Sequence, residues 1–80
     1  MTIFLPGQLV SPEPEMINDK LCVFLYDKEA GINSKETGHM EENDVGLVIS
    51  VGRGGQIVYV VAPNGTGWAY GAFLKIVKQA

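Results

Sequence analysis

The sequence has few cysteines, few basic residues and no long apolar run. Cys22 is its single cysteine, which excludes a framework of internal disulfides and favours a reducing compartment. No apolar run approaches the ~20 residues of a membrane-spanning helix. The start of the chain lacks the basic and long apolar regions of a secretory signal. We therefore expect a cytoplasmic protein with no membrane segment and no cofactor.

Charge is sparse in the second half of the chain. All nine acidic residues lie before Val45, together with three lysines, which gives this part a charge of −6. Residues 45–80 carry only Arg53, Lys75 and Lys78, a charge of +3. Nonspecific affinity for nucleic acids comes from lysine and arginine side chains that neutralise phosphates. The acidic first half therefore argues against a general nucleic-acid binder.

The length and composition indicate one small globular domain over residues 1–80. The chain is 46% hydrophobic and 19% charged, which is typical of a folded protein rather than a disordered one. A chain of this size buries only about 60% of the surface that its unfolded form exposes. There is no room for a separate catalytic domain, and we do not expect an enzyme.

The most informative stretch is residues 57–77, with the sequence IVYVVAPNGTGWAYGAFLKIV. Residues 57–61 are all β-branched or aromatic and predict a strand. Asn64-Gly65 then predicts a tight reversal, because both residues tolerate positive φ. Residues 66–70 predict the return strand. Residues 71–74 are too few for a stable helix and predict one 3₁₀ turn before a last strand at 75–77.

The two faces of the return strand differ in size. Side chains alternate along a strand, so Thr66, Trp68 and Tyr70 share one face, while Gly67 and Ala69 share the other. Small inward residues let a tightly curved sheet close without overfilling its core. We therefore place Gly67 and Ala69 inward and the two aromatic side chains at or near the outside.

Further strands are predicted upstream of this stretch. Pro6-Gly7 predicts a turn before a short first strand that ends at Val10, and the two prolines in residues 11–15 indicate a loop or an edge. Residues 21–26 are wholly apolar and predict a second strand. Residues 45–51 predict another, with the apolar side chains at 45, 47, 49 and 51 facing inward. Residues 52–56 form the turn that follows.

Between these strands lies a polar stretch of eighteen residues, Asp27 to Asp44. It has no helical periodicity and predicts a long acidic loop, which is either an ordered binding loop or a flexible one. His39, Glu41, Glu42 and Asp44 share it. A metal site needs three or four converging ligands, and this loop offers nothing apolar to fix them. We expect a solvated acidic loop, no metal site, and Cys22 as a buried small hydrophobe.

The order of these elements, with two short motifs, resembles the SH3-like small barrel. Residues 24–30, FLYDKEA, are similar to the ALYDYEA opening of SH3 domains, and residues 67–74, GWAYGAFL, are similar to their closing motif. The resemblance covers roughly residues 21–77. It implies an all-β SH3-like barrel of five to six short strands. The strand at residues 7–10 and that at 46–49 are most similar to those of short SH3-like proteins of tailed bacteriophages, which implies a viral protein in the host cytoplasm.

The resemblance also implies which aromatic residues face a partner. SH3 domains grip proline-rich peptides with aromatic side chains, and two of those positions fall on Tyr26 and Phe73. Lys28, Tyr70 and Ala72 replace other motif residues, so proline-rich ligands are not implied. We also expect Phe73 and either Tyr26 or Tyr59 to contribute to the core.

From these observations we predict a non-catalytic binding module or assembly subunit that contacts a protein or peptide partner. Aromatic side chains with a polar edge are favoured at interfaces. The predicted binding residues are the following: Tyr26, Glu41, Glu42, Trp68, Tyr70 and Phe73. The apolar runs 21–26 and 57–62 exceed what one inward face needs, so a homo-oligomer or a docked partner is expected. The alternative is a nucleic-acid-binding barrel of the KOW or Tudor type, with Arg53, Lys75 and Lys78 on phosphates.

Overall fold

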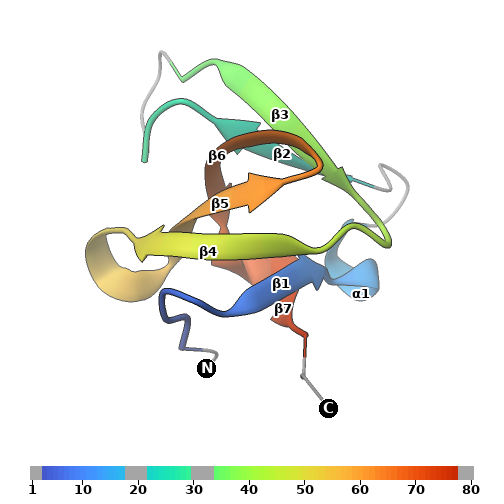
Figure 1. Ribbon diagram of the computed structural model, residues 1–80, viewed down its shortest axis with the longest axis horizontal. Coiled ribbons are helices and arrows are strands. Elements are labelled where there is room, and N and C mark those ends of the chain that lie inside the picture. Colours follow the sequence, from blue (N-terminus) through green and yellow to red (C-terminus); the bar gives the residue numbers. More distant parts are fainter. Residues whose placement is uncertain (1–2, 18–21, 30–33, 78–80) are drawn as a thin grey trace.

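The protein is an all-β curled sheet, seen here in a computed structural model that describes residues 3–17, 22–29 and 34–77. Seven antiparallel strands form an open half-barrel (Figure 1). The strands are β1 (Leu9–Pro12), β2 (Cys22–Tyr26), β3 (Glu36–Glu41), β4 (Gly46–Val51), β5 (Ile57–Ala62), β6 (Asn64–Tyr70) and β7 (Leu74–Ile76). Single helical turns occur at α1 (Pro14–Ile17), η2 (Arg53–Gly55) and η3 (Gly71–Phe73). The all-β prediction is confirmed, with seven strands instead of five or six.

The strand order shows why the sheet is open. It runs β2-β3-β6-β5-β4-β1-β7, with an additional contact between β2 and β6. In Figure 1 the β2–β3 hairpin lies at the top and β1 and β7 lie at the bottom. Within the described part of the chain the two end strands, β2 and β7, do not pair with each other. The hairpin folds back over β6 instead, so the sheet curls without closing.

The predicted hairpin of residues 57–70 is confirmed. β5 and β6 pair from Ile57 opposite Tyr70 to Ala62 opposite Gly65. The two linking residues are Pro63 and Asn64, one position earlier than predicted, and Gly65 follows with a φ of 140°. The predicted 3₁₀ turn and last strand are present as η3 and β7, and β7 begins one residue earlier than predicted.

The prediction for residues 11–15 needs correction in part. β1 continues through Ser11 to Pro12, so these two residues form a strand and not a loop. They pair with β7 alone, so on the side of β4 this end of β1 is an edge, as the alternative prediction had it. Its pairing with β4 ends at Val10, whereas Pro12 pairs only with Leu74 of β7. The N–H that proline lacks is therefore not needed by β4. Pro14 begins α1, at a helix position where proline is favoured.

The predicted long loop of residues 27–44 is also wrong in part, because it contains β3. This strand pairs with β2 along its length and with β6 at Gly38 and His39. Thr37 Oγ1 donates a further hydrogen bond of 2.8 Å to the carbonyl oxygen of Thr66. Residues 30–33 of the loop, and Leu21 of the strand predicted at 21–26, lie outside the described residues.

The hydrophobic core lies on the inner side of the curled sheet. Burial shows that the orientation predicted for β4 is wrong at two positions. Leu47 and Ile49, predicted to face inward, are 40% and 47% exposed, whereas Val48 is buried. The pattern misleads because Gly46 and Val48, at the alternate positions, are also nonpolar. The buried cluster comprises Phe4, Val10, Val23, Leu25, Met40, Val48, Val58, Val60, Ala69 and Leu74.

Candidate functional site

Three aromatic side chains form a row across the outer face of the sheet. Tyr59 on β5 pairs with Trp68 on β6, and Trp68 pairs in turn with Tyr26 on β2. Directly paired residues of antiparallel strands point to the same side of a sheet. The rings of Tyr59 and Trp68 meet edge to face, with centroids 5.2 Å apart. All three side chains are half-buried, and we call them the aromatic row.

Gly67 and Ala69, the small residues on the inner side of β6, allow the strands that carry this row to approach closely. Both are buried, as predicted, and Trp68 between them faces outward. A Cβ atom on Gly67 would lie 2.7 Å from the carbonyl oxygen of Tyr26 and 2.4 Å from Thr37 Oγ1. The absence of that atom lets the backbone of β2 cross β6 in direct contact. Tyr26 therefore reaches Trp68 only because residue 67 is glycine.

Tyr70 and Phe73 form a second aromatic pair, next to a cleft of about 660 Å³. Their ring centroids are 6.5 Å apart, at an interplanar angle of 82°. Tyr70 lines the cleft together with Ile3, Phe4, Glu13, Gly55 and Leu74, among others. Phe73 is 38% exposed, so its predicted place in the core is wrong.

Two further predictions about single residues are corrected by burial. The buried aromatic side chain is Phe4, at 5% exposure, whereas Tyr26 and Tyr59 are both half-buried. Phe4 was missed because it lies outside any predicted strand. Cys22 is half-buried rather than buried, and it pairs with Glu41.

Glu41 and Glu42, the predicted acidic binding residues, lie away from the aromatic row. Glu41 pairs with Cys22, four residues from Tyr26 and therefore roughly 13 Å away along β2. The residue that pairs with Tyr26 is Glu36, at the other end of β3. The acidic side chain beside the row is therefore that of Glu36, from the middle of the predicted loop and not from its end. The sequence pattern contains no signal that singles out this residue.

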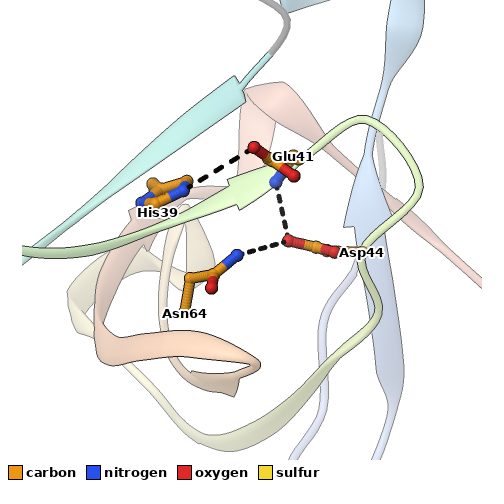
Figure 2. A network of polar contacts seen from close by, with 4 residues as sticks. All are labelled: His39, Glu41, Asp44 and Asn64. Carbon is orange, nitrogen blue, oxygen red and sulfur yellow. Dashed lines mark hydrogen bonds and ion pairs between the residues drawn. The ribbon is translucent and has the colours of Figure 1, made fainter.

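Asp44 holds the turn between β3 and β4. Its Oδ2 accepts hydrogen bonds from the backbone N–H of Glu41, at 2.9 Å, and from Asn64 Nδ2, at 3.3 Å (Figure 2). Ser11 Oγ donates to the carbonyl oxygen of Asp44 at 2.7 Å. His39 Nε2 lies 4.0 Å from Glu41 Oε1. These contacts join three strands at one corner and give Asp44 a structural role.

The described residues contain no group of three histidine, cysteine, aspartate or glutamate side chains that could hold a metal ion. In the part of the chain described, no helix is long and apolar enough to cross a membrane. On β4, β5 and β6 the outer face around the aromatic row has no charged side chain. Arg53, which lies between β4 and β5, is the only charged residue between Val45 and Leu74. Solvent-facing sides of antiparallel sheets are normally polar, so this face is unusual.

Comparison with known proteins gives no relative from which a role could be carried over. No protein-family model matches the chain, and it has no match among the curated proteins or the solved structures. The function must therefore be argued from the surface itself.

Proposed function

We propose that this protein is a non-catalytic binding module or assembly subunit that contacts a protein partner through the aromatic row and the neighbouring Tyr70–Phe73 pair. The observation that carries the proposal is the row itself. Tyr26, Tyr59 and Trp68 come from three strands and are all only half-buried. Large amphipathic rings on a sheet face with few charges bury much area at little entropic cost when a partner covers them.

The acidic contribution to this surface comes from Glu36. It lies beside Tyr26 at the end of the row and is exposed, so it can meet a basic side chain of the partner. A charge at the rim of an interface affects the association rate and its salt dependence more than the affinity. Glu41 and Glu42, which are also exposed, lie at the far end of β3 and would contribute less.

We also propose that the fold is related to the SH3-like small barrel. Three features favour an SH3-like small barrel: the tight β5–β6 hairpin, the single 3₁₀ turn η3 after it, and a short last strand that pairs with the first strand. The β2–β3 hairpin between β1 and β4 then stands where such barrels have a long loop. The phage-like character suggested by residues 7–10 and 46–49 belongs to this proposal too.

Trp68 provides a direct test, because it is the only tryptophan of the chain. A partner isolated with the tagged protein is titrated against it while the tryptophan emission is recorded. We expect a shift in the emission, and loss of at least tenfold in affinity for Tyr26→Ala, as for a central aromatic contact. Leu47→Ala, at an exposed site on the same sheet face, serves as the control. Binding without an emission change, and unaffected by Tyr26→Ala, would contradict the proposal.

A further inference from the structure

The cleft beside Tyr70 is a concave site whose walls are joined by backbone hydrogen bonds. It has a volume of about 660 Å³ and is lined by the N-terminal segment, Glu13, the η2 and η3 turns and the start of β7. The N–H of Glu13 donates to the carbonyl oxygen of Phe73 at 2.7 Å. The N–H of Gly71 donates to the carbonyl oxygen of Gln56 at 2.8 Å. These bonds fix the walls relative to one another, and a preorganised site of this volume is typical of binding pockets.

Glu13 is the one charged residue among those that line the cleft. It is half-buried, and no described lysine or arginine side chain forms an ion pair with it, since the ion pair among the described residues is that of His39 with Glu41. Arg53, although next to Gly54 in the chain, is not one of the lining residues. A charge in a concave site with apolar walls attracts an opposite charge more strongly than on an open surface, because the effective dielectric constant is lower there. The cleft therefore favours a cation.

The remainder of the cleft wall is largely apolar. Ile3 is 71% exposed and Tyr70 is 46% exposed, whereas Phe4 and Leu74, which also line the cleft, are buried. Aromatic rings attract cations, and exposed apolar side chains favour an occupant that covers them. The occupant that meets both conditions combines an apolar stem with a cationic end.

Of the basic side chains in proteins, arginine meets these conditions best. Its guanidinium group is more weakly hydrated than an ammonium group, stacks on aromatic rings and pairs with a carboxylate through two parallel hydrogen bonds. Lysine has a compact and strongly hydrated charge, which is harder to bring into a partly dry cleft. We propose that the cleft binds an arginine side chain of the protein partner, with the guanidinium group on the Glu13 carboxylate and the stem against Tyr70 and Ile3.

This inference rests on the proposed function, because it names the chemistry of the partner next to the Tyr70–Phe73 pair. It is not implied by the resemblance to SH3 domains, which covers roughly residues 21–77. Ile3, Phe4 and Glu13 line the cleft and lie outside that stretch.

A side chain of a protein partner fits the surroundings better than a free small cation does. Phe73 contacts Tyr70 and is 38% exposed, but it does not line the cleft. Apolar surface therefore continues past the cleft, and only a larger molecule covers both parts. Glu36, at the end of the aromatic row, is a second exposed carboxylate, and the chain has a net charge of −3. A partner with basic residues complements both carboxylates and is attracted at long range.

A titration with a model compound tests the cleft before any partner is known. The whole isotope-labelled chain is titrated with N-acetyl-arginine methylamide while the amide chemical shifts are recorded. We expect shifts at Gly55, Gly71 and Ala72, which line the cleft, with a dissociation constant on the order of millimolar, as for a single side chain. The citrulline compound, which has nearly the same shape and no charge, should bind about tenfold more weakly. The lysine compound should also bind more weakly than the arginine compound.

Three variants separate the contributions of charge and ring. Glu13→Gln keeps the size of the side chain and the backbone bond to Phe73, and it should weaken binding of the arginine compound by about tenfold. Glu15→Gln, at an exposed residue of α1, is the matched control and should leave the dissociation constant unchanged. Tyr70→Leu keeps an apolar wall without the ring and should reduce the preference for arginine over lysine. With the partner itself, Glu13→Gln should lower both the affinity and its dependence on salt.

Three results would overturn the proposal: equal affinity for the arginine and citrulline compounds, shifts confined to residues outside the cleft, or an equal effect of Glu15→Gln and Glu13→Gln. If the arginine compound binds but Glu13→Gln leaves the affinity for the partner unchanged, the cleft takes a free cation, and its assignment to the partner is wrong. Failure of the arginine compound to bind, while partner binding still depends on Tyr26, removes only this inference. Binding of the compound, with a partner indifferent to Tyr26→Ala, removes only the role of the aromatic row.

Discussion

Gly38 and Gly65 face each other across β3 and β6 so closely that neither position has room for a side chain. A Cβ atom on Gly38 would lie 2.6 Å from the Cα of Gly65, and one on Gly65 would lie 2.5 Å from the Cα of Gly38. The atoms in the way are backbone, which cannot rotate aside as a side chain can. This contact holds the β2–β3 hairpin against the rest of the sheet.

Gly38→Ala should therefore destabilise the protein by about 3 kcal/mol, the upper part of the usual range for overpacking. The strands must separate to admit the methyl group, which weakens the pairing of β3 with β6. Urea unfolding gives the change as a shift of the midpoint. Gly54→Ala is the comparison, because its new methyl meets no atom within 4 Å but its φ of 76° costs about 1 kcal/mol. A smaller loss for Gly38→Ala than for Gly54→Ala would contradict this account.

The strands that the sequence predicts are those with local signals, and β3, which is held by contacts with distant strands, is not among them. β5 and β6 are predictable because their evidence is local: a β-branched run, a turn signal at Asn64-Gly65, and a large and a small face. β3 is not, because Met40 is its only buried apolar side chain and its stability comes from pairing with distant strands. A run such as Glu36–Glu41 has no alternation from which a strand could be inferred.

The candidate site likewise has one part that the local sequence predicts and one part that it does not. That Trp68 faces outward follows from its neighbours Gly67 and Ala69. That Tyr26 lies beside it depends on the crossing of β2 over β6, which no local pattern records. The prediction for β4 is wrong at Leu47 and Ile49, where burial is decided by the register of Val48 with Val60. It is confirmed at Val51, which packs against the core beyond the bulge between Val48 and Ser50.

Asp44 should be the most sensitive residue of the β3–β4 turn. Asp44→Ala removes the acceptor of two hydrogen bonds, from the N–H of Glu41 and from Asn64, and should cost about 1–2 kcal/mol, as for the loss of a capping side chain. Asp44→Asn keeps one acceptor oxygen and should cost less. Thermal unfolding of both variants provides the measurement. Asn43→Ala, at an exposed neighbour, should change stability by less than about 0.5 kcal/mol; an equal effect there would argue against the role of the Asp44 carboxylate.

The edge-to-face contact of Tyr59 and Trp68 should appear as a coupling energy. In a double-mutant cycle with Tyr59→Leu and Trp68→Leu, the loss in the double variant should fall short of the sum of the single losses by about 1 kcal/mol, as measured for aromatic pairs. Chemical denaturation of the four proteins gives the four free energies. The Tyr70–Phe73 pair, which is wider at 6.5 Å and more exposed, should show a smaller coupling. Additive effects at Tyr59 and Trp68 would mean that the two rings are held independently.

Phe4 should prove essential to the fold although it precedes the first strand. Its side chain is 5% exposed, and its ring lies against Gly71, where a Cβ atom would come within 2.6 Å of Phe4 Cε2. Phe4→Ala should cost about 3–5 kcal/mol, a large share of the roughly 4–12 kcal/mol expected for a domain of this length. Leu5→Ala is the control, since Leu5 is 57% exposed. Equal urea midpoints for the two variants would show that the N-terminal segment does not pack on η3 in solution.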